Sequence, residues 1–85
     1  MNPMSTNPTS TNATAAINTV TISVNGESRA TKPGATVVDL LRELGLDHGR
    51  VAIERNLEIL PRDQWSTTQV QPNDRYEIVH FVGGG

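Results

Sequence analysis

The sequence contains no cysteine. The chain can therefore form no disulfide, no thiolate zinc site, no cysteine-ligated iron–sulfur cluster and no thiol nucleophile. It also lacks an excess of positive charge, since 7 Lys and Arg stand against 9 Asp and Glu, for a formal charge of −2. Nucleic-acid binding requires a basic patch, so we expect no nucleic-acid partner.

Long apolar runs are absent as well. A membrane-spanning helix needs about 20 apolar residues, and the start of the chain lacks the basic and apolar regions of a signal peptide. We therefore expect a cytoplasmic protein that does not associate with membranes. The 85 residues have room for one small domain.

No group of residues suggests catalysis by this chain. The sequence shows no convincing Ser-His-Asp arrangement, and His48 and His80 are far apart without a carboxylate pattern around them. We interpret both histidines as ordinary surface or strand residues. The prediction is a protein that is not an enzyme, with no catalytic residue and no metal site.

The composition divides the chain into three parts. Residues 1–18 carry no charged side chain and consist mainly of Asn, Ser, Thr, Pro and Ala, which predicts a disordered segment. Residues 19–82 contain the periodic apolar patterns of a folded domain. Residues 83–85 form a flexible glycine tail.

The domain begins with the pattern of a β-hairpin. Apolar and polar residues alternate over 19–24, as in a half-buried strand. Asn25-Gly26 is a strong signal for a type I′ turn, because both residues tolerate positive φ angles. Residues 27–31 are therefore expected to return antiparallel.

A helix follows. Thr36 and Asp39 resemble a capping box at its start, and Gly45 is suited to end it. Apolar residues between them fall on one helical face, which we assign to the core: Val37, Leu40, Leu41 and Leu44.

The sequence of the second half of the domain predicts further strands. They lie around Val51 and Ile53, at Ile59 and Leu60, and over 75–82, with a helical turn at 62–65 that carries a structural Trp65. The turn at Asn56-Leu57 lacks the usual glycine, so we expect it to be looser or of another type. A mixed sheet of four to five strands with one main helix across it is an α+β fold, and the β-grasp (ubiquitin-like) arrangement fits this order.

Gly83, Gly84 and Gly85 are the most informative residues of the sequence. Glycine has no Cβ, so a run of it is thin enough to enter a narrow channel in another protein. The group that this tail presents is the α-carboxylate of Gly85. The alternative is an ordinary frayed end without function.

Strand alternation before the tail predicts a docking patch. If Tyr76 and Ile78 face the core, Val79 and Phe81 face outward, and with Val82 they form an apolar surface beside the glycines. The opposite register, with Phe81 buried, is the alternative.

Five motifs together resemble one family. They read VTISVNGE, TVVDLLRELGL, VAIERN, ILPRDQW and YEIVHFVGGG, and they are similar to the ThiS family of thiamine-pathway sulfur carriers, which are ubiquitin-like β-grasp proteins. The resemblance covers residues 19–85. The family ends in two glycines and this chain in three, which leaves two possibilities: Gly85 reacts, or it is removed first.

The resemblance implies a function and its partners. A ThiF-like adenylyltransferase would use ATP and magnesium to adenylate the Gly85 carboxylate, while Gly83 and Gly84 enter its active site, so this chain would bind no cofactor itself. A cysteine desulfurase or another persulfide donor would supply sulfur. The resulting thiocarboxylate would pass its sulfur to thiazole synthase. A relative of the molybdopterin synthase small subunit, a protein modifier and a β-grasp binding module are the alternatives.

Overall fold

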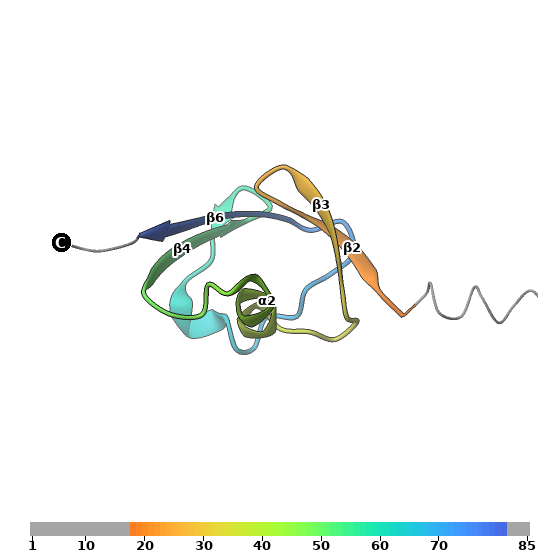
Figure 1. Ribbon diagram of the computed structural model, residues 1–85, viewed down its shortest axis with the longest axis horizontal. Coiled ribbons are helices and arrows are strands. Elements are labelled where there is room, and N and C mark those ends of the chain that lie inside the picture. Colours follow the sequence, from red (N-terminus) through yellow and green to blue (C-terminus); the bar gives the residue numbers. More distant parts are fainter. Residues whose placement is uncertain (1–17, 82–85) are drawn as a thin grey trace, which may run out of the picture.

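The computed structural model describes residues 18–81 (Figure 1). The predicted glycine tail at 83–85, Val82 and all but Asn18 of the predicted disordered segment lie outside the described residues. Within residues 18–81, no helix combines the length and the apolar character needed to cross a membrane.

Five strands form one mixed sheet in the order β3-β2-β6-β4-β5. Their bounds are β2 Val20–Val24, β3 Glu27–Thr31, β4 Arg50–Arg55, β5 Glu58–Ile59 and β6 Arg75–Phe81. The helix α2, Val37–Leu44, lies across one face of this sheet (Figure 1). A short 3-10 helix, Arg62–Gln64, provides the predicted helical turn. The α+β prediction and the β-grasp order are confirmed.

The last strand is the centre of the sheet. β6 pairs in parallel with β2 and antiparallel with β4, so the first and last described strands are neighbours. Its inward side chains Tyr76 and Ile78 are buried against the helix layer with Ile53 and Leu40. The strand that leads toward the glycines is therefore held on both sides at its beginning.

The local signals around the helix are confirmed. The Thr36 hydroxyl accepts a hydrogen bond from the Asp39 N–H (3.2 Å), and the Asp39 carboxylate accepts one from the Thr36 N–H (3.0 Å). Both are donors that a helix start would otherwise leave unpaired. Gly45 ends the helix in the left-handed conformation, at φ +73°.

Two tight turns have positive φ angles at both of their central residues. Asn25 and Gly26 have φ angles of +52° and +85°, as the type I′ prediction requires. Asn56 and Leu57 have φ angles of +52° and +73°, so the expectation of a different turn at this position was wrong. Leu57 adopts a left-handed conformation that its Cβ disfavours.

A buried carboxylate holds the start of β6. Asp74, only 5% exposed, accepts hydrogen bonds from Arg55 Nε (3.0 Å), Asn56 Nδ2 (3.1 Å), the Gln71 N–H (2.9 Å) and the Tyr76 hydroxyl (2.8 Å). Burial alone would raise the pKa of Asp74, but these hydrogen bonds outweigh it and lower the pKa below its usual 3.8. Asp74 thereby joins the β4–β5 turn to the central strand.

Trp65 has the structural role that the sequence suggests. Its ring is buried in the core cluster, and its indole N–H donates to the Leu60 carbonyl (2.9 Å). The Arg62 guanidinium lies over the ring, 4.9 Å from its centroid.

Candidate functional site

The exposed end of β6 carries the predicted docking residues. Val79 and Phe81 are 52% and 54% exposed, while Tyr76 and Ile78 on the other face are buried. The outward register is therefore right, and the alternative with Phe81 in the core is wrong. Val82, Gly83, Gly84 and Gly85, which complete the predicted site, lie outside the described residues.

Two further apolar side chains are exposed on the other side of β4 from the beginning of β6. Ile59 of the edge strand β5 is 71% exposed, and Leu57 in the adjoining turn is 72% exposed. Ile59 lines a small hollow of about 100 Å³ together with Ala52 and Val79. We call Ile59, Val79 and Phe81 the outer patch. Sequence reasoning missed Ile59, because a two-residue strand shows no alternation from which to read its face.

The outer patch has an acidic border. Glu54 and Glu77 lie directly opposite each other on β4 and β6, and both line the same hollow. Like charges at opposite positions of an antiparallel pair repel each other. Next to Phe81 the charge is positive, because Arg50 lies opposite it. A Lys or Arg side chain of a partner would therefore match the patch at Glu54 and Glu77.

The two histidines, treated separately in the sequence, meet at the same end of β6. Their rings contact edge to face with centroids 5.7 Å apart, and His80 Nε2 lies 3.0 Å from the His48 carbonyl oxygen. Since a carbonyl only accepts, Nε2 of His80 carries the proton of this bond. Within residues 18–81, no group of three or more His, Cys, Asp or Glu side chains could hold a metal ion.

Gly49 allows the loop before β4 to approach β6. A Cβ at this position would lie 3.1 Å from His80 Nε2, and the φ angle of Gly49 is +78°. The conformation disfavours any other residue, and the contact would require the His80 ring to shift. The loop before β4 thus packs against the end of β6, the strand that precedes the predicted tail in sequence.

Comparison with known proteins identifies the family. The model of the ThiS family matches residues 22–85. The chain belongs to the ThiS family. The sulfur carrier protein ThiS of Bacillus subtilis is 37% identical over 75% of this chain and 98% of its own length. A ThiS crystal structure from Geobacter metallireducens superposes with a TM-score of 0.66 at 30% identity, covering 78% of this chain and all of the other.

The chain also matches part of two longer proteins that have a different name. A thiazole synthase of Paramagnetospirillum magneticum is 48% identical over 62 residues, which are 73% of this chain but only 19% of the synthase. A second thiazole synthase, from Magnetococcus marinus, is 39% identical over 20% of its length. The chain therefore spans about a fifth of the thiazole synthases it matches, and these proteins contain a region similar to this ThiS domain.

Proposed function

We propose that this protein is the sulfur carrier for the thiazole part of thiamine and that Gly85 carries the sulfur. One observation supports this most strongly: the chain matches a sulfur carrier over 98% of that carrier's length. Here β6, the central strand, precedes the three glycines in sequence. A rigid strand would present the tail to an enzyme at a defined position.

The proposed chemistry begins with activation of a poor electrophile. A carboxylate oxygen of Gly85 attacks the α-phosphorus of ATP, pyrophosphate leaves, and an acyl adenylate forms. The terminal sulfur of a persulfide then attacks the acyl carbon, and AMP leaves. A thiol finally attacks the donor's sulfur and cleaves the sulfur–sulfur bond. This leaves a thiocarboxylate on the carrier and a disulfide between the donor and the thiol.

The activating groups come from the partner proteins in this scheme. A ThiF-like adenylyltransferase supplies ATP, magnesium and the catalytic side chains, and a cysteine desulfurase or another donor supplies the persulfide. The carrier contributes the tail and a surface for docking. The absence of cysteine from the chain means that the sulfur nucleophile belongs to another protein.

Thiazole synthase is the proposed acceptor of the sulfur. The similarity of this chain to a region of two thiazole synthases supports the pairing, because fused domains commonly act in one process. The thiamine-pathway names of the relatives favour this acceptor over molybdopterin synthase. We place the protein in the cytoplasm, where ATP is available.

The outer patch is the proposed docking surface for the adenylyltransferase. Its three apolar side chains are exposed, two of them on β6, the strand that precedes the tail in sequence, and exposed apolar patches mark interaction sites. Glu54 and Glu77 would pair with basic groups of the enzyme.

Intact mass spectrometry tests the function. The full chain is incubated with its adenylyltransferase, MgATP and a persulfide donor, and is compared with a form that lacks Gly85. We expect a mass gain equal to replacement of one oxygen by sulfur, only when Gly85 is present. A gain only in the shortened form would mean that Gly85 is removed before the reaction, and no gain in either form would refute the carrier function.

A further inference from the structure

One side of β6 is unpaired toward its end. β2 pairs with β6 only at Arg75 and Tyr76, whereas β4 pairs with β6 from Tyr76 to Phe81. Beyond Tyr76, the side chain of Asn25 bonds to the N–H and C=O of Ile78 in place of a strand. Among residues 18–81, no strand follows Asn25 along this side.

The backbone of His80 therefore faces an open edge. The carbonyls of Asp74 and Tyr76 and the N–H of Ile78 all bond toward the β2 side. Residues two apart on a strand direct their backbone groups to the same side, so those of His80 point there too. An exposed strand edge of this kind can pair with an extended segment of another protein.

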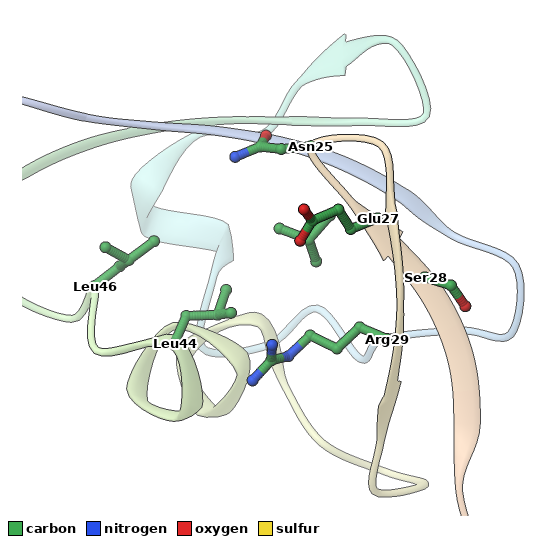
Figure 2. Close-up of a pocket in the computed structure, with 7 residues that line it drawn as sticks. Asn25, Glu27, Ser28, Arg29, Leu44 and Leu46 are labelled. Carbon is green, nitrogen blue, oxygen red and sulfur yellow. The ribbon is translucent and has the colours of Figure 1, made fainter.

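A groove lies beside this open edge. It has a volume of about 350 Å³, and it is bordered by the β2–β3 hairpin and by the end of α2 (Figure 2). We call it the hairpin groove, and the residues that matter here are Val24, Asn25, Glu27, Arg29, Leu44 and Leu46. Asn25 lines the groove and bonds to Ile78, so it connects the groove to β6 at the point where β2 departs from that strand.

The groove has an apolar floor and an available cation. Leu44 and Leu46 are half-buried, and the Arg29 side chain extends from β3 toward Leu44 (Figure 2). Within the described part of the chain, Arg29 takes part in none of the three ion pairs, which join Arg42–Asp39, His48–Asp47 and Arg55–Asp74. Because Glu27 lines the groove as well, a ligand with an apolar group and a carboxylate that contacts Arg29 and not Glu27 would complement these features.

We propose that an extended segment of the thiazole synthase adds to the open edge of β6 at His80. An apolar side chain of this segment enters the hairpin groove, and an acidic side chain pairs with Arg29. Alternate side chains of an added strand point to one face, so backbone pairing and groove filling are compatible. This inference rests on the proposed function, because the enzyme that receives sulfur from Gly85 must lie close to the end of β6.

Binding of full-length variants to the thiazole synthase, measured by isothermal titration calorimetry, tests the charge contact. Arg29→Glu is expected to weaken binding about fivefold. Lys32→Glu makes the same charge change at an exposed position outside the groove and is expected to bind like the wild type. Equal binding by the two variants would overturn the assignment of Arg29.

Proline tests the backbone contact. His80→Pro removes the N–H on the open edge, and His80→Ala removes the same side chain but keeps the N–H. We expect the proline variant to bind about tenfold more weakly than the alanine variant. Equal affinities would overturn the strand pairing.

Hydrogen exchange of the wild-type protein provides a test that needs no variant. The His80 amide is expected to become protected when the synthase is added, and unchanged exchange in the saturated complex would overturn the proposal. Absence of any binding by the wild-type carrier would instead count against thiazole synthase as the acceptor. The mass experiment on Gly85 contains no thiazole synthase, so it shows independently whether the carrier function itself is right.

Discussion

The side-chain amide of Asn25 bonds to both backbone groups of Ile78, 53 positions away in the sequence. Its Nδ2 donates to the Ile78 carbonyl (3.1 Å), and its Oδ1 accepts from the Ile78 N–H (2.7 Å). The residue that forms the hairpin turn thus also extends the pairing of the central strand by one step.

Replacing Asn25 tests this second role separately from the turn. Asn25→Gly keeps a residue that tolerates positive φ but removes both hydrogen bonds, so we expect a loss of about 2 kcal/mol in the free energy of unfolding, measured in urea. Asn25→Asp keeps the acceptor and is expected to lose less. A glycine variant as stable as the wild type would show that the amide contributes nothing to stability.

Leu57 is expected to reduce the stability of the domain. Its φ angle is +73° and its side chain is 72% exposed, so it has an unfavourable backbone conformation and little packing to compensate. Leu57→Gly should raise the free energy of unfolding by about 1 kcal/mol. The midpoint of thermal unfolding should rise accordingly. Leu57→Ala removes the side chain but keeps the Cβ, and equal stability of these two variants would contradict the explanation.

Asp74 should make stability depend on acid pH. Because its pKa in the folded state is lowered, its contribution is present above the unfolded value, about 4, and is lost as the pH falls through the folded pKa. Asp74→Asn should cost about 2–3 kcal/mol at neutral pH. The difference from the wild type should shrink below about pH 4. Urea unfolding at several pH values measures both effects, and a difference that is constant with pH would contradict them.

Tyr76 provides a matching test at alkaline pH. Burial, and then its bond to Asp74, raise the pKa of Tyr76 to about 12. The neutral phenol is favoured in the folded state, so stability should fall as the pH rises from the unfolded value, about 10, toward 12. Tyr76 is the only tyrosine, so phenolate absorbance reports on it alone. Titration near pH 10 in the folded protein would refute this prediction.

Tyr76→Phe removes only the hydroxyl that donates to Asp74. We expect the free energy of unfolding to fall by about 1–2 kcal/mol at neutral pH, since Asp74 loses one of its four donors. Calorimetric unfolding measures the effect.

Phe81 tests the outer patch. Phe81→Asp removes an exposed ring from the patch and places a charge opposite Arg50, so adenylation by the partner enzyme should slow by about tenfold or more while the fold stays intact. Thr21→Asp places the same charge at an exposed position near the start of β2, outside the outer patch, and should leave adenylation unchanged. Circular dichroism checks the fold, and unfolding of the Phe81 variant would mean that Phe81 contributes to stability and not only to docking.

Much of the fold could be predicted because its signals are local. The capping box of Thr36 and Asp39, the end of the helix at Gly45 and the turn at Asn25-Gly26 each depend on residues a few positions apart. The alternation from Tyr76 to Phe81 likewise determined which side chains face outward. The glycine tail and the motifs before it indicated the ThiS family.

Other features were decided only by the tertiary structure. Asn25 meets Ile78, Asp74 meets Arg55 and Asn56, and His48 meets His80 because strands distant in sequence align in one register. No local pattern specifies which polar groups then lie opposite one another. The open edge of β6 has the same origin: the sequence by itself determined the strand, but only the departure of β2 at Asn25 decided that the backbone of His80 would be unpaired.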